Sequence, residues 1–185
     1  MLGWWKRYAK DTIRRLAEFS EVRTQTKQLC LTGDSRTLEI YSTIQKEDKE
    51  FAKLVKKNKI RGIFTSPPYV GVIDYHEQHA YAYEMFNLPR MDNLEIGSMT
   101  SGSNRAAQSA YVDGISDVLL NCQQYLVYDF DIFLVANDRY QLYSKIADKA
   151  GLMICQEFKR PVLNRAEGNK GKYSESIFHM KRRNT

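Results

Sequence analysis

Strand-like and helix-like segments alternate along most of the chain, and this alternation is the strongest constraint on its fold. The segments of strand character are short runs rich in β-branched and other apolar residues: 60–65, 131–136, 153–158 and 174–180. The segments of helix character have apolar side chains three or four residues apart: 46–59, 107–125 and 140–150. Such alternation predicts an α/β fold, in which a mostly parallel sheet carries helices on its faces. Because ligands of such sheets bind beyond the carboxyl ends of the strands, we expect the chemistry to follow residues 65 and 136.

The N-terminal part of the chain and one long polar stretch lie outside this alternation. Residues 4–19 have apolar side chains at helical spacing with basic residues between them, which predicts an amphipathic helix. We therefore divide the chain into a helix that serves as a docking element, residues 1–25, and one domain, residues 26–185. Residues 28–32 are apolar and stop at a Gly-Asp pair, which predicts a short strand that runs into a turn. Residues 87–106 are polar and predict a long loop, which in a compact domain is usually functional.

The charge of the chain favours a polyanionic partner. Its 28 basic and 22 acidic residues give a formal net charge of +6, and basic side chains that neutralise phosphates release condensed counterions. The positive charge is concentrated before Arg61 and after Arg139, while the stretch between them carries mostly Asp and Glu. We interpret this pattern as two basic flanks around a central segment with another task, although ordinary solvated helix faces would give the same pattern.

Other features of the composition exclude several classes of protein. No apolar run approaches the roughly 18–20 residues of a membrane span, and the apolar residues 1–5 are followed at once by two basic residues, unlike a signal peptide. Cys30, Cys122 and Cys155 are scattered and odd in number, which argues against a disulfide framework or a paired-thiol metal site. We therefore expect a protein of the cytoplasm that neither spans a membrane nor binds a metal.

The strand at residues 60–65 ends abruptly at Ser66, Pro67 and Pro68, which Tyr69 follows. Prolines fix φ and carry no N–H group, so the carbonyls of Ser66 and Pro67 are free to point into a cleft as acceptors. The Ser66 hydroxyl adds another polar group, and Tyr69 offers a flat face for stacking. Such a site suits a planar group that bears an exocyclic amine.

The sequence FTSPPY at residues 64–69 resembles the catalytic motif of the S-adenosylmethionine-dependent DNA amino-methyltransferases, which is Ser/Asp/Asn-Pro-Pro-Tyr. Residues 69–84, 135–138 and 158–165 resemble further blocks of the same family, in the same order. The resemblance covers nearly everything from Gly33 onward. It implies a partial Rossmann-like methyltransferase sheet and a site-specific DNA methyltransferase of the kind found in restriction–modification systems.

The resemblance also implies a mechanism for these residues. The target base is flipped out of the duplex and stacks on Tyr69. Its exocyclic amine donates to the Ser66 hydroxyl and the Pro67 carbonyl, and this geometry favours in-line attack on the methyl group of the cofactor. Pro68 stiffens the motif. A serine at the first motif position is commoner in the enzymes that methylate N4 of cytosine than in those that methylate N6 of adenine, so we favour cytosine and keep adenine open.

The cofactor side of the family's site is incomplete in this sequence. The resemblance assigns Asp34, Thr65 and Ser66 to S-adenosylmethionine, with Asp34 in the block that approaches its adenine. The family's main cofactor signature, a glycine-rich turn after the first strand, is absent, since no two glycines of the chain form a Gly-x-Gly. We expect that turn upstream of the motif, on a second polypeptide or on a lost part of a longer chain.

The remaining candidates are residues that line the substrate side of the site. Asp74, His76 and His79 follow the motif and are expected to line the base pocket rather than to bind a metal, while Arg160 and Arg165 are expected to contact DNA phosphates. Each has a plainer interpretation as a buried hydrogen-bonding group or a solvated surface residue. A catalytically inactive DNA-binding or assembly remnant stays an alternative function. Methylation of RNA or of a protein glutamine is a further alternative, against which the block at residues 69–84 argues.

Overall fold

A computed structural model of the protein describes residues 2–161 and 174–183. The chain divides into two compact units, Met1–Cys30 and Leu31–Thr185. The first unit contains one helix, α1 (Leu2–Val22), whose large apolar side chains are exposed. The elements of the second unit are α2 (Ile40–Glu47), α3 (Lys49–Asn58), β1 (Ile60–Thr65), α4 (Tyr75–Gln78), α5 (Ala80–Phe86), the 3-10 helix η1 (Asp92–Leu94), α6 (Arg105–Gln123), β2 (Leu126–Ala136), α7 (Tyr143–Lys149), β3 (Leu152–Pro161) and β4 (Ser174–Arg182).

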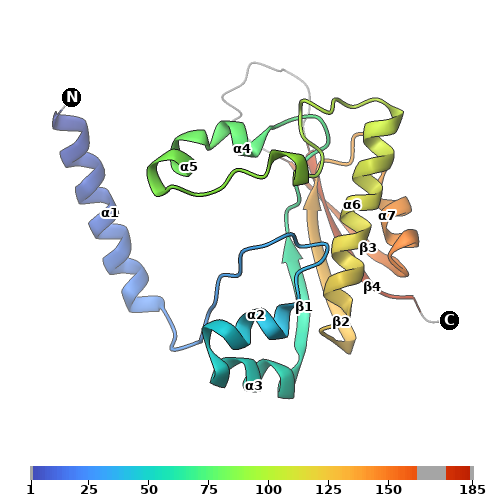
Figure 1. Cartoon of the computed structure of the whole chain (residues 1–185), viewed down its shortest axis with the longest axis horizontal. Coiled ribbons are helices and arrows are strands. Elements are labelled where there is room, and N and C mark those ends of the chain that lie inside the picture. The colour runs from blue at the N-terminus through green and yellow to red at the C-terminus, as the bar shows by residue number, and fades with distance from the viewer. Residues whose placement is uncertain (1, 162–173, 184–185) are drawn as a thin grey trace. The chain divides into compact units, whose positions relative to one another are not determined.

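The four strands form one sheet in the order β1-β2-β4-β3 (Figure 1). β1 and β2 pair in parallel, with Thr65 opposite Leu134. Gly62 of β1 is required by this pairing, because a Cβ there would lie 2.5 Å from the carbonyl oxygen of Asp131. β4 pairs antiparallel with both β2 and β3. It follows that β1, β2 and β3 run in one direction and β4 runs in the other.

The prediction of a mostly parallel sheet is therefore wrong for the described strands, although the mixed α/β class is confirmed. The alternation correctly gave the common direction of three strands. It could not show that β4 inserts between β2 and β3. This insertion replaces one pair of parallel neighbours with two pairs of antiparallel neighbours.

The core lies between the sheet and the helices α6 and α7 (Figure 1). Alternate residues of β2 are buried against these helices, among them Phe130, Ile132 and Leu134, as expected for a strand with one covered face. The side chains between them point to the opposite face, where Phe133 is 36% exposed. Phe64 of β1 lies opposite Phe133 and is 81% exposed. Within the second unit, the described helices therefore leave this part of the second face open.

Two further expectations about local structure are corrected. Residues 28–32 form no strand in the structure, because no described strand lies beside them to supply hydrogen bonds. The helix expected at residues 46–59 is broken at Asp48, which has extended backbone angles (φ −148°, ψ 101°) and accepts the Phe51 N–H at 2.8 Å as the cap of α3. Within the part of the chain that the structure describes, no helix has the length and apolar character needed to cross a membrane.

Candidate active site at the end of β1

The Ser-Pro-Pro-Tyr segment leaves the sheet directly after β1, and its backbone is anchored at one point. Tyr111 of α6 donates a hydrogen bond to the carbonyl oxygen of Pro68 at 2.8 Å. The hydroxyl of Tyr143 of α7 lies 2.6 Å from that of Tyr111. Because a phenol has one hydrogen, Tyr143 must donate to Tyr111 while Tyr111 donates to Pro68. Burial raises the pKa of Tyr111 to about 12, so this chain of donors stays protonated at physiological pH.

The hydrogen bond from Tyr111 occupies the carbonyl of Pro68, and the residues before Pro68 lie at least partly at the surface. Ser66 is exposed, while Thr65, Pro67 and Pro68 are half-buried. The Ser66 hydroxyl and the Pro67 carbonyl, which we predicted as the acceptors for an amine, therefore lie just before a fixed point of the backbone.

Tyr69 is held at both ends of its side chain. Its ring packs against the hydrophobic core, and its hydroxyl donates to Oε1 of Glu175 at 2.7 Å. The Glu175 side chain is only 12% exposed and forms an ion pair with Arg160, its partner in the pairing of β3 with β4. Arg160, predicted to contact phosphate, thus has a protein partner, although its side chain is 58% exposed. Arg165 lies outside the described residues.

Sequence reasoning missed Glu175, which we had interpreted only as the start of a strand. Glu175 is more than a hundred residues from Tyr69 in the chain. Only the register of the β3–β4 pair, which sets Glu175 opposite Arg160, could have indicated that it is paired.

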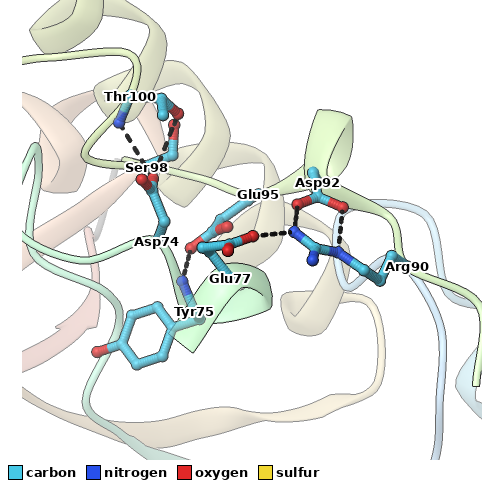
Figure 2. Close-up of polar contacts among 8 residues, drawn as sticks. All are labelled: Asp74, Tyr75, Glu77, Arg90, Asp92, Glu95, Ser98 and Thr100. Atoms are coloured by element: carbon cyan, nitrogen blue, oxygen red, sulfur yellow. Dashed lines mark hydrogen bonds and ion pairs between the residues drawn. The ribbon is translucent and has the colours of Figure 1, made fainter. Parts of the chain in front are cut away.

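The segment after Tyr69 is tied to the long loop at residues 87–106, as Figure 2 shows in part. The Asp74 carboxylate accepts the backbone N–H of Thr100 at 3.1 Å and lies 3.3 Å from its hydroxyl. The N–H of Tyr75 donates to Glu95 at 2.6 Å, and Arg90 pairs with Glu77 and Asp92. The loop is therefore fastened along the block that follows the motif, and these hydrogen bonds of the Asp74 carboxylate are with this loop.

Gly71 brings the same loop against the motif itself. Its φ of +69° is in the left-handed region, and its N–H donates to the carbonyl of Gly97 at 2.9 Å. A Cβ on Gly71 would lie 2.8 Å from the carbonyl oxygen of Gly102. Glycine is thus required here by both the backbone angle and the close approach.

A cleft of about 670 Å³ brings together three residues that we had assigned separately: Asp34, His76 and His79. The rest of its wall is mostly apolar and includes Tyr83, whose ring centroid is 5.0 Å from that of His76. Nδ1 of His76 is buried and has no hydrogen-bond partner among the described residues. Ser66 and Tyr69 are not in the wall of this cleft as the structure describes it.

Asp34 is oriented by a turn that α6 holds in place. The buried Asn121 donates from its amide to the carbonyls of Ser35 and Leu38, both at 3.1 Å. Arg36 donates to both carboxylate oxygens of Asp34, and this pair holds the pKa of Asp34 below its ordinary value. Neither Arg36 nor Asn121 was predicted. Arg36 is only two residues from Asp34, whereas the contacts of Asn121 with the turn join distant parts of the sequence.

Asp138 lies at the end of β2, beside the site, and caps the turn that leads into α7. Its Oδ1 accepts the N–H of Leu142 at 2.7 Å. Burial raises its pKa above the ordinary value of 3.8. The folded protein therefore binds the proton of Asp138 more readily than the unfolded chain does, so the ionised carboxylate lowers stability at neutral pH.

Replacing Asp138 with asparagine should raise the free energy of unfolding at pH 7, because the amide oxygen can still accept from Leu142 and carries no charge. The gain should shrink as the pH falls through the raised pKa of Asp138, and it should vanish once the carboxyl of both states is protonated. Urea unfolding measured from pH 3 to 8 checks this. The control is Asp129→Asn, at a side chain that is 84% exposed. An Asp138→Asn gain that did not change with pH would contradict the role of burial.

Within the described ranges, no group of three or more His, Cys, Asp or Glu side chains is placed to hold a metal ion. The three cysteines are free thiols.

Comparison with known proteins identifies a relative over nearly the whole chain. The sequence is 52% identical over 174 residues, 94% of this chain, to the Type II methyltransferase M.MjaII of Methanocaldococcus jannaschii. The relative is a methyltransferase. The chain spans 33% of the length of that protein. No family model matches the chain, and no solved structure matches it significantly.

This similarity supports the resemblance to methyltransferases across the part of the chain that carries the motif, the cleft and the anchoring helices.

Proposed function

We propose that these residues form the target-base half of an S-adenosylmethionine-dependent DNA methyltransferase, which methylates an exocyclic amine of a flipped base. The observation that carries the proposal is the arrangement of Ser66–Tyr69 at the end of β1. Ser66 is exposed, the backbone is anchored at Pro68, and the ring of Tyr69 is fixed beside them. The similarity to a Type II methyltransferase supports the reaction class.

The chemistry of the site follows from these positions. The amine of a flipped cytosine or adenine would donate to the Ser66 hydroxyl and the Pro67 carbonyl, while its ring stacks on Tyr69. Two fixed acceptors favour the geometry in which the nitrogen lone pair points at the methyl group, so positioning and oriented dipoles provide the catalysis. S-adenosylmethionine would supply the methyl group. We favour N4 of cytosine because Ser66 occupies the first position of the motif, and N6 of adenine is the second candidate.

The cofactor would be held partly by this chain and partly by other polypeptide. Asp34 opens onto the 670 Å³ cleft, whose apolar wall suits the adenine of the cofactor. The glycine-rich turn that the resemblance leads us to expect is not in the sequence. We propose that this turn belongs to polypeptide outside these 185 residues, on the same chain or on a second one.

The outer edge of β1 is the proposed attachment site for that polypeptide. β1 is an edge strand of the described sheet and pairs only with β2. An edge strand presents unpaired N–H and C=O groups that readily accept another strand. Phe64, exposed on this strand, would then be covered by the added part. The exposed apolar side chains of α1, which include Trp5 and Leu16, are proposed as a second docking element.

The isolated chain should show no saturable S-adenosylmethionine binding in calorimetry, because the turn that cradles the cofactor is missing. The complete enzyme, in which the cofactor turn is present, should bind the cofactor and transfer a labelled methyl group to unmodified genomic DNA. Stoichiometric, tight cofactor binding by the isolated chain would refute the half-enzyme proposal. DNA binding without any methyl transfer by the complete assembly would instead favour an inactive DNA-binding or assembly protein.

A further inference from the structure

We propose that Glu175 is a positioning residue, which fixes the hydroxyl end of Tyr69 and so the direction of its core-packed ring for stacking on the target base. This inference rests on the proposed function, since it assigns the task of Glu175 through that of Tyr69. It adds a residue outside the Ser-Pro-Pro-Tyr motif, contributed by β4.

The hydrogen bond between Tyr69 and Glu175 has the properties of a strong, oriented contact. The Tyr69 hydroxyl donates to a carboxylate oxygen at 2.7 Å, within reach of the short distances typical of O–H···O⁻ bonds. Glu175 is only 12% exposed, so solvent competes little for its oxygens. A charge-assisted bond in such surroundings is roughly twice as strong as one between neutral groups.

Arg160 keeps Glu175 in place from the other side. Its guanidinium binds the second carboxylate oxygen, Oε2, while Tyr69 binds Oε1. Arg160 and Glu175 face each other in the register of β3 and β4, so the backbone of both strands sets the position of the carboxylate. The hydrogen bond to Glu175 raises the pKa of Arg160 above its ordinary value, so the guanidinium keeps its charge.

The consequence for Tyr69 is that its ring has little freedom. A tyrosine side chain turns about two bonds. Packing against the core restricts the ring along its length, and the bond to Glu175 fixes its tip. A ring that is fixed before the base arrives loses less entropy on stacking, so the flipped base is captured in one orientation relative to Ser66.

The first experiment observes the ring without any reaction. The isolated chain is labelled with ¹³C at tyrosine Cζ, and the Tyr69 signal is identified by its absence from Tyr69→Phe. Glu175→Ala should shift the Tyr69 signal strongly, and Glu175→Gln should shift it less because the amide oxygen remains an acceptor. The control Asp148→Ala removes an exposed ion pair with Arg183 and should leave the signal in place. An unchanged signal in Glu175→Ala would overturn the proposal.

The second experiment measures methyl transfer by the complete enzyme on unmodified genomic DNA. Glu175→Ala and Tyr69→Phe should each lower kcat about tenfold to hundredfold, the effect expected for loss of a hydrogen bond to a charged group. The double variant should be no worse than either single variant, because both remove the same contact. Glu175→Gln should recover part of the rate, and the KM for DNA should change little in all of them.

The outcomes separate the two proposals. If the wild-type enzyme methylates DNA and the effects of the two variants multiply, or Glu175→Ala is as active as wild type, the role of Glu175 is refuted and the function stands. If the wild-type enzyme does not methylate DNA at all, the proposed function fails, while the Cζ signal still reports whether Glu175 holds the ring.

Discussion

Replacing Ser66 with alanine should lower methyl-transfer turnover of the complete enzyme by about a hundredfold, the scale seen when one preorganised polar partner of a transition state is removed. The hydroxyl is one of the two acceptors that we propose for the target amine, and it lies at the exposed start of an otherwise anchored segment. The hydrogen bond to Ser66 is needed mainly in the transition state, as the amine nitrogen becomes pyramidal. Its removal should therefore lower kcat. Steady-state kinetics with labelled S-adenosylmethionine measures it.

DNA affinity provides the comparison that gives this result its meaning. It should change by no more than about twofold in Ser66→Ala, since the interaction is made chiefly in the transition state. The matched control is Ser42→Ala, which removes an exposed hydroxyl that bonds to the Glu39 carbonyl beside α2 and should keep full turnover. Losses of equal size in DNA binding and in turnover would show that Ser66 has a structural role instead.

Replacing Leu134 with alanine should lower the free energy of unfolding of the chain by about 2–5 kcal/mol, the usual cost of truncating a fully buried leucine. Leu134 of β2 has no exposed surface. It pairs with Thr65 of β1, the residue directly before the motif. Urea unfolding of the isolated chain measures the change.

Phe64→Ala is the control, because it removes a larger side chain from the neighbouring strand. Phe64 is 81% exposed, so its loss should change the free energy of unfolding by less than about 0.5 kcal/mol. If Phe64→Ala destabilised the isolated chain as much as Leu134→Ala, the second face of the sheet would have to be covered in solution.

The parts of the fold that the sequence predicted are those governed by local patterns. β1 has the bounds expected from its apolar run and the prolines after it, and α6 lies within two residues of the expected helix at each end. Two of the errors concern partners, while the break at Asp48 in the helix expected at residues 46–59 is a local capping effect. Residues 28–32 have the composition of a strand but no described neighbour, and β4 has a place in the sheet that no local pattern encodes. Pairing across long stretches of chain depends on tertiary packing, which a single sequence does not display.

The candidate site shows the same division between what the sequence predicted and what it could not. The motif predicted where the chemistry should lie, and this stays a prediction. The structure puts Asp34, His76 and His79 around one cleft, whose described wall does not include Ser66 or Tyr69. The residues that hold the site in shape were not foreseen. Tyr111 anchors Pro68, and Glu175 holds Tyr69, each from a distant part of the chain. Such supporting residues have no motif of their own, because their role comes from the fold that places them.

The insertion of β4 between β2 and β3 makes the outer half of the sheet depend on a single strand. In the described sheet β3 pairs with no strand except β4, so β3 can peel away alone, whereas β4 cannot detach from β2 without taking β3 with it. Glu175 is carried by β4 and Arg160 by β3. Fraying of the outermost strand would thus withdraw the arginine first and leave the carboxylate still bound to Tyr69.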